Sequence, residues 1–344
     1  MTREYRVRSR PAARMRGRQR GAALLAAMLV VTLVATFAAA ALWQQWRSVE
    51  VESAERSRVQ SAWILTGALD WARLILREDA RAGGADHLAE PWAVPLQEAR
   101  LSSFLAADRN NTADMDNEAL NVFISGQITD LQSLLNVTNL VESGTVSQPH
   151  LRQFARLFDL LGLPQAHLTR LVENLRFASD IHVDNRSSGE AALLPQRVEQ
   201  LVWLGVPVQT VAVLEPYITI LPARRPVNLN TAPAEVLYAV LEGISMADAQ
   251  RLVSERERSH FRTISDAAKL VSAGPGAEAF ADNRVSVASG FFEVRGRIRL
   301  GKVVIEERSI VQRDGLDVRV VQREKGVVDP TALSRAAAAA TAQR

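Results

Sequence analysis

The side chains best suited to chemistry are scattered along this chain, and their spacing builds no recognisable catalytic site. The five histidines show no metal-ligand spacing. No Gly-x-Ser-x-Gly elbow, phosphate-binding loop or His-Glu-x-x-His pair occurs. The chain has no cysteine, which excludes thiol chemistry and disulfide bonds. The residues therefore indicate neither an enzyme nor a resident cofactor.

Two acidic segments remain as candidate metal sites, because Ca²⁺ prefers carboxylate oxygens. The first lacks the glycine and the spacing of an EF-hand, and the second is partly occupied by Ile181, His182 and Val183. Solvated polar loops are the default interpretation of both, and calcium is the alternative. The candidate ligands are Asp108, Asp114, Asp116, Asp180, Asp184 and Glu190.

The N-terminus has the composition of a membrane anchor. Eight arginines precede Gly21, and residues 22–46 contain no charged side chain. About 20 apolar residues suffice for a helix to cross the hydrocarbon layer, and the arginines would keep its start in the cytoplasm. Everything after Arg47 would then lie outside the cytoplasm. The side chains expected to form the membrane stem include Leu24, Leu25, Leu29, Leu33, Phe37 and Trp43.

The charge of the chain is concentrated in this leader. The first 21 residues carry a net charge of +7, whereas the remainder has 33 basic and 37 acidic side chains. The basic pI is therefore a targeting signal and not a nucleic-acid-binding surface.

The helix that begins in the apolar stretch is predicted to continue well beyond it. Leu65, Leu69, Ala72 and Leu76 recur at helical spacing, and no Gly or Pro interrupts residues 47–60. A cleavable secretory signal ending near Ala38-Ala39-Ala40 is the alternative, but such signals have a shorter apolar core.

Residues 148–283 are predicted to be helical, with three similar turns. Each turn places Gly and an aliphatic residue before Pro or Ser, between two helical patterns. This repetition indicates helix-hairpin-helix units. The turns are Leu161-Gly162-Leu163-Pro164, Leu204-Gly205-Val206-Pro207 and Glu242-Gly243-Ile244-Ser245.

The last unit permits a second interpretation. It resembles helix-hairpin-helix DNA-binding modules, and its segment Val227–Leu237 offers Asn and Thr as candidate helix caps, with Pro and Glu in the first turn. Such modules normally close the hairpin with a second glycine, where this chain has Ser245, and Asp248 follows. An acidic side chain beside a phosphate site opposes binding, so a structural hairpin is favoured over DNA contact.

Strand patterns flank the helical block. Asn121–Ile128 is rich in β-branched residues, and Pro91–Pro95 is a short strand or edge segment. After residue 284 the period becomes two, with arginines on a solvated face and an Asp314-Gly315 turn between strands. The expected fold class is α+β. A long N-terminal helix would pack on a small antiparallel sheet, with a large all-α, SAM-like domain inserted between its strands.

The junction Arg20-Gly21-Ala22-Ala23-Leu24-Leu25 resembles the leader of the type IV pilin and pseudopilin family. The family's pattern implies cleavage between Gly21 and Ala22 by the prepilin peptidase. The family usually has glutamate five residues into the mature chain, where this chain has Ala26. That departure, the Asn-Thr-Ala-Pro segment and the inserted helical domain are similar to the K-type minor pseudopilins of type II secretion.

The resemblance implies a non-enzymatic subunit capping the pseudopilus tip in protein export. It implies I- and J-type minor pseudopilins, other pseudopilins, the inner-membrane platform and the prepilin peptidase as partners, without nucleic acid. It also implies a single-pass inner-membrane protein with a periplasmic C-terminal domain. A membrane-anchored DNA-binding protein and a secreted protein are the alternatives. The expected segments are 1–21 leader, 22–46 membrane stem, 47–78 amphipathic continuation, 79–147 first part of the α/β domain, 148–283 inserted domain, 284–325 closing strands and 326–344 disordered tail.

Overall fold

The computed structural model describes residues 19–101, 122–179, 192–271, 277–281, 283–300 and 303–328. The chain divides into two compact units, residues 1–62 and residues 63–344. Helix α1 (Gln19–Ala82) begins in the first unit and ends in the second.

The first unit consists, in its described part, of the apolar portion of α1 and the polar turns that follow. Every described residue from Gly21 to Glu50 is exposed, although most of the side chains up to Trp46 are apolar. Within the described part of the chain, α1 is the one helix long and apolar enough to cross a membrane, with a mean hydropathy of 2.4 in its most apolar window. Apolar side chains without protein cover are what a helix in lipid requires.

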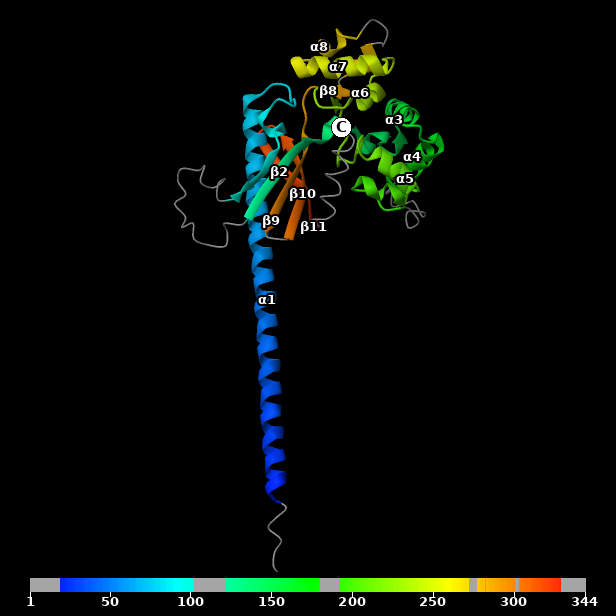
Figure 1. The fold of residues 1–344 in the computed structure, drawn as a ribbon. Coiled ribbons are helices and arrows are strands. Elements are labelled where there is room, and N and C mark those ends of the chain that lie inside the picture. The colour runs from blue at the N-terminus through cyan, green and yellow to red at the C-terminus, as the bar shows by residue number, and fades with distance from the viewer. Residues whose placement is uncertain are drawn as a thin grey trace, which may run out of the picture. The chain divides into compact units, whose positions relative to one another are not determined.

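The second unit is built on a five-stranded antiparallel sheet in the order β1-β2-β9-β10-β11 (Figure 1). The sheet is therefore made from two distant parts of the chain. The strands are β1 (Leu96–Arg100), β2 (Val122–Asp130), β9 (Phe291–Leu300), β10 (Val303–Asp314) and β11 (Asp317–Val328).

The last turns of α1 pack on one face of this sheet. Leu69, Leu76 and Trp92 form a buried cluster with Phe292 and Val311. Trp92 belongs to the 3-10 helix η1 (Pro91–Ala93), and its ring meets Phe292 edge-on with centroids 5.2 Å apart. The periodic apolar residues of α1 face the sheet, because steps of three and four residues place them on one side of the helix.

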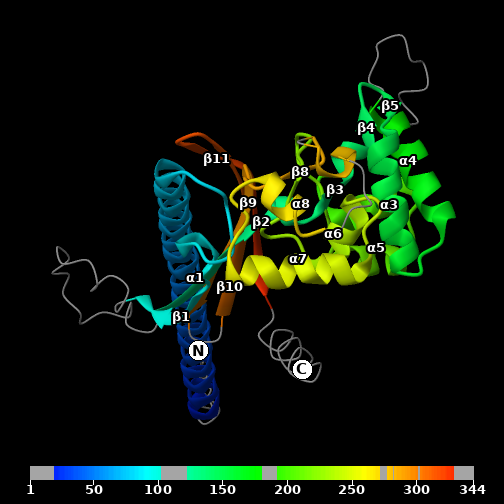
Figure 2. The same ribbon diagram turned by 90° about the horizontal axis from the view of Figure 1, so that it is seen from above.

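The chain leaves the sheet after β2 and returns at β9, and the segment between is mostly helical (Figure 2). Its own apolar core includes Phe154, Leu171, Leu201 and Leu237. The helices are η3 (Leu131–Ser133), η4 (Val137–Leu140), α3 (Gln148–Leu160), α4 (Gln165–Ser179), η6 (Val198–Leu204), α5 (Val208–Leu214), α6 (Ala234–Val240), α7 (Met246–Arg258), α8 (Ile264–Ala268) and η7 (Ala277–Phe280).

Short strand pairs tie this segment together. The pair β7–β8 is parallel and closes the segment just before it rejoins the sheet. The short strands are β3 (Leu135–Asn136), β4 (Val141–Glu142), β5 (Thr145–Val146), β6 (Ile218–Thr219), β7 (Val227–Asn228) and β8 (Val285–Ser286). The three predicted glycine turns join α3 to α4, η6 to α5 and α6 to α7, and each glycine has positive φ. The predicted α+β class, with a long N-terminal helix, a small antiparallel sheet and further helices, is confirmed. The inserted segment is not all-α, because it contains these short strand pairs.

Several predicted details differ from the structure. Residues 91–95 are not a strand; Pro91 instead begins the 3-10 helix, because its ring fixes φ and removes a donor from any ladder. The segment before Gly205 is a 3-10 helix and not an α-helix. Strand β11 runs three residues beyond the predicted end at Lys325 because β10 pairs with it as far as Val328. Residues 329–344, predicted to be disordered, lie outside the described residues.

Candidate functional site

The residues predicted for processing and membrane insertion all lie near the start of α1. Gly21, Ala22 and Ala26 are exposed helical residues, and a methyl group added to Gly21 would meet no atom of the described residues within 4 Å. Because position 26 is alanine, no carboxylate enters the apolar stretch at that point. The predicted stem side chains are between 45% and 69% exposed: Leu24, Leu25, Leu29, Leu33, Phe37 and Trp43.

The six acidic residues predicted as calcium candidates lie outside the described residues, in the segments 102–121 and 180–191. Calcium at either segment stays a prediction, to be tested by thermal unfolding with calcium against chelator.

A buried carboxylate joins the sheet to the helical segment. Asp130, at the end of β2, accepts hydrogen bonds through Oδ2 from Thr231 Oγ1 at 2.6 Å, Ser289 Oγ at 2.6 Å and Asn228 Nδ2 at 3.2 Å. Its Oδ1 accepts a bond from the Gln132 amide at 2.7 Å. Burial raises the pKa of Asp130 to about 6, although these donors favour the charged form.

The Asn-Leu-Asn-Thr segment provides two of the four donors to Asp130. Asn228 Nδ2 also donates to the Asp86 carbonyl at 3.2 Å. Asn230 forms a two-way bond with the backbone of Phe261, at 2.9 Å and 2.8 Å. The prediction that Asn and Thr of this segment cap the next helix is wrong. Pro233 holds the cap position of α6 without a side-chain bond, and Asn228 and Thr231 donate to Asp130 instead.

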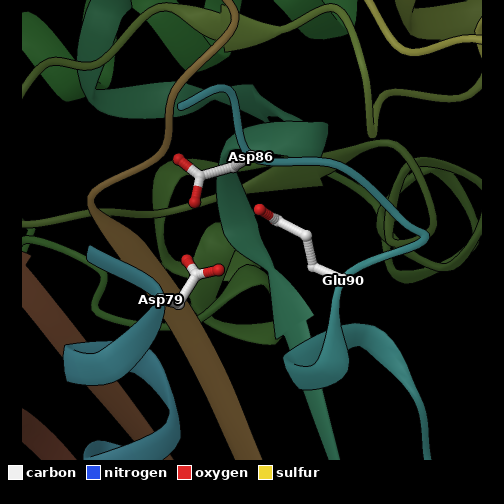
Figure 3. A group of neighbouring side chains, drawn as sticks. All are labelled: Asp79, Asp86 and Glu90. Atoms are coloured by element: carbon white, nitrogen blue, oxygen red, sulfur yellow. The ribbon is translucent and has the colours of Figure 1, made fainter. Parts of the chain in front are cut away.

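A second acidic cluster lies where α1 ends. Figure 3 shows Asp79, Asp86 and Glu90 gathered together, and one oxygen from each lies within 4.8 Å of the others. Arg313 of β10 donates to Asp79 at 2.6 Å and forms an ion pair with Asp86. Glu90 accepts the Trp92 indole N–H at 2.7 Å. Burial raises the pKa of both aspartates.

Carboxylates are ligands that hard cations prefer, but in this cluster the Arg313 guanidinium already pairs with two of the three, Asp79 and Asp86. Each of the three carboxylates has a protein donor, and the Arg313 side chain is only 9% exposed. The arrangement is suited to fixing the end of α1 against β10. It offers no exposed base or nucleophile for catalysis.

The hairpin between α6 and α7 was predicted to be structural because it carries an acidic residue. Asp248 Oδ2 accepts the Ser245 amide at 3.0 Å and the Ser245 hydroxyl at 2.7 Å, so its carboxylate lies at the start of α7. These bonds hold the pKa of Asp248 below its usual value. Arg156 points inward and donates to the Tyr238 carbonyl at 2.7 Å. A negative charge at the helix start repels a phosphate, which argues against DNA contact here.

The arginine stripe of β9, predicted to be a solvated face, is half-exposed and paired with glutamates of neighbouring strands. Arg297 donates to Glu306 at 2.7 Å, and Arg299 pairs with Glu98 while its guanidinium lies 4.0 Å from the centre of the Phe123 ring. These arginines therefore link neighbouring strands of the sheet, and their pairing with glutamates disfavours binding of an anionic ligand.

Comparison with known families identifies the helical segment. Residues 133–223 match the model of the first domain of type II secretion system protein K, and residues 227–288 match the protein K model itself. These two segments are domains of the protein K family of the type II secretion system. The second match begins at Val227, so it contains the Asn-Leu-Asn-Thr segment that binds Asp130.

Relatives and a solved structure agree with this family. The chain is 28% identical over 303 residues to the type II secretion system protein K of Pseudomonas aeruginosa, covering 80% of this chain and 83% of the relative. It is 28% identical over 298 residues to that of Pectobacterium carotovorum, covering 78% and 85%. Its fold is similar to a chain in the GspK–GspI–GspJ complex of enterotoxigenic Escherichia coli. There the TM-score is 0.63 at 20% identity, covering 79% of this chain and 98% of that one.

Proposed function

We propose that this chain is the minor pseudopilin that closes the tip of the type II secretion pseudopilus, and that it acts by assembly and not by catalysis. The similar solved chain is part of a complex with GspI and GspJ, so the I- and J-type minor pseudopilins are the proposed partners here. Other pseudopilins and the inner-membrane platform complete the proposed assembly.

The observation that carries this proposal is the position of the helical segment on the sheet. It leaves at the end of β2 and returns at the start of β9, where Asp130 lies opposite Phe292. The end of α1 lies at this same end of the strands, because Arg313 binds both Asp79 of α1 and the Ser289 carbonyl just before β9. A subunit stacked beyond the end of α1 would have to displace the helical segment.

The alanine at position 26 supports the same placement. A carboxylate in the apolar stretch is costly unless a positive group pairs with it. A subunit that lies above all others has no neighbouring N-terminal amine beyond it, so alanine at this position removes that cost. The proposed topology is a single pass through the inner membrane, with the arginines in the cytoplasm and the α/β unit in the periplasm.

Processing provides the direct test of the proposed function. When the full chain is produced with its prepilin peptidase, N-terminal sequencing should give a mature protein that starts at Ala22. Gly21→Leu should block this cleavage, because a bulky side chain replaces the residue next to the cut bond, and the unprocessed chain should not co-purify with I- and J-type subunits. Cleavage near Ala40, or full assembly of the uncleaved chain, would contradict the proposal.

A further inference from the structure

Two histidine rings from distant parts of the chain lie stacked on each other. His87 belongs to the loop between α1 and η1, and His260 directly follows Ser259, the C-cap of α7. The ring centroids are 3.8 Å apart, and the ring planes are inclined by 11°. Both residues are partly exposed, so protons reach the rings from solvent. The stack is therefore a solvent-accessible contact between the end of α1 and the helical segment.

Each ring is carried by a turn that is fixed independently of the stack. The His87 amide donates to Glu90 Oε2 at 2.9 Å, and the Glu90 amide donates back to the His87 carbonyl at 3.2 Å. On the other side, Phe261 next to His260 is held by the two hydrogen bonds of Asn230 described above. The rings can therefore separate while both turns remain folded.

The hydrogen bonding of His87 requires a neutral ring. The Ala89 amide donates to His87 Nδ1 at 3.3 Å, so this nitrogen carries no proton and the neutral ring holds its proton on Nε2. A second proton has to bind Nδ1, and an N–H group there cannot accept from Ala89. Protonation therefore costs His87 this hydrogen bond.

Two carboxylates face His87, but a protein cation already pairs with both. Asp79 of α1 and Asp86 of the same loop favour a charge on His87. Arg313 of β10 forms ion pairs with both carboxylates, which offsets their attraction for a second cation. Burial lowers the pKa of His87 in spite of the two carboxylates.

The surroundings of His260 also favour a neutral ring. Burial lowers the pKa of His260, and the charges of His87 and Arg262 lower it further, whereas Glu90 opposes them. Since both pKa values are lowered, the folded chain binds fewer protons than the unfolded chain just below the ordinary histidine value of 6.5. The contribution of the stack to stability is complete above that value and is lost as the pH falls below it.

We propose that His87 and His260 form an acid-sensitive latch between the end of α1 and the helical segment. Two neutral rings stack without charge repulsion, whereas two imidazolium rings with centroids 3.8 Å apart repel each other. A single proton leaves one charge and no repulsion, so the second proton opens the latch. It breaks the Ala89 bond and drives the rings apart. The latch is a property of this chain alone, so its failure would leave the proposed function in place.

Hydrogen exchange of the full chain in detergent tests the latch directly. The protection factor, which is the ratio of the intrinsic to the observed exchange rate, removes the chemical effect of pH on exchange. Between about pH 7.5 and about pH 5, the protection of residues 259–262 should fall by about tenfold, the effect of one unit of pKa shift. His87→Phe combined with His260→Phe keeps two stacked rings without a titrating group, so its protection should not change with pH.

His167→Gln is the matched control, because His167 lies on α4 and its ring bonds Thr210. This variant should lose the same protection as the wild type. If the wild type keeps its protection at the lower pH, no latch opens. If the double phenylalanine variant loses protection as the wild type does, other groups cause the opening and the proposal is wrong.

Histidine NMR tests the coupling of the two rings without the double variant. In the full chain with isotope-labelled histidine, the ring signals of both residues should titrate below the ordinary histidine value. In His87→Gln, His260 no longer faces a ring that can become charged, so the pKa of His260 should rise toward that value. An unchanged pKa of His260 in this variant would show that the rings do not interact, which overturns the latch.

Discussion

At the scale of single residues, Asp130 shows how a polar group specifies the fold at a cost. Its carboxylate is 2% exposed and depends on side chains from two other segments, Thr231 and Asn228 in one and Ser289 in the other. An apolar residue at Asp130 could pack against many surfaces, whereas a buried carboxylate is satisfied only when these donors meet it. Asn228 and Thr231 of the Asn-Leu-Asn-Thr segment are thereby explained as donors to one buried acceptor.

The raised pKa of Asp130 gives this residue a defined pH dependence. Its folded-state pKa of about 6 lies above the ordinary value of 3.8, so the folded chain binds more protons between these two values. The stabilising contribution is complete below the ordinary pKa and is lost as the pH rises through about 6. Asp130→Asn should remove this dependence. Between about pH 4.5 and about pH 7.5, the free energy of unfolding of the wild type should fall by on the order of 2 kcal/mol more than that of the variant.

Urea unfolding of the full chain at the two pH values measures this difference. Asp317→Asn, which changes an exposed carboxylate at the start of β11, serves as the control and should follow the wild type. Parallel pH profiles for the wild type and Asp130→Asn would show that Asp130 ionises in the folded chain as it does in water.

At the scale of elements, the three glycine hairpins organise the helical segment. Each places a glycine with positive φ between a helix end and the next helix start. They differ in their surroundings: Gly162 faces open space, whereas a methyl group on Gly205 would lie 2.8 Å from the Arg170 side chain. Asn174 holds the second hairpin on α4 by donating to the Leu204 carbonyl at 2.9 Å.

This contrast predicts unequal effects of the same substitution. Gly162→Ala should destabilise the chain by about 1 kcal/mol, the cost of a left-handed backbone for a residue with Cβ. Gly205→Ala should cost about 2 kcal/mol, because Arg170 must also move away. Chemical denaturation of the two variants shows which loses more free energy of unfolding. Equal losses would mean that the Arg170 side chain moves away from Gly205 at no cost in free energy.

The elements were largely predictable, and the contacts between them were not. Periodicity indicated the sheet-facing leucines of α1, the glycine turns and the final meander, because these signals are local. The polar clusters escaped prediction, since Arg313 and Asp79 are 234 positions apart and neither sits in a motif. The asparagines of the Asn-Leu-Asn-Thr segment were given a local role. A single sequence shows that an asparagine can cap a helix, but it does not show that a distant buried aspartate will accept its hydrogen bond.

At the scale of the whole second unit, the two buried clusters connect the sheet with the helical segment. Asp86 takes part in both, since its carboxylate pairs with Arg313 and accepts the Ser289 amide at 2.6 Å, while its carbonyl accepts from Asn228. The segment between β2 and β9 is therefore joined to the sheet by polar contacts as well as by the chain itself.

Removing these contacts should uncouple the two parts. In the full chain, Asn228→Ala combined with Thr231→Ala leaves Asp130 with two of its four donors, at a cost of about 1.5–3 kcal/mol for each lost bond to the charged group. Calorimetry should then show two unfolding transitions in place of one. Thr145→Ala, at an exposed position of the short strand β5, should keep the single transition. A single transition in the double variant would mean that apolar packing alone holds the parts together.

The pairing of β2 with β9 also determines when the sheet can form during synthesis of the chain. Ribosomes release β1 and β2 long before β9 to β11, and two strands by themselves are barely stable. Until the closing strands arrive, Leu65, Leu69 and Leu76 have no sheet to cover them. The N-terminal half therefore stays incompletely folded, with exposed apolar side chains, until the closing strands are synthesised. In this interval we expect it to bind chaperones and to be most prone to aggregation and degradation.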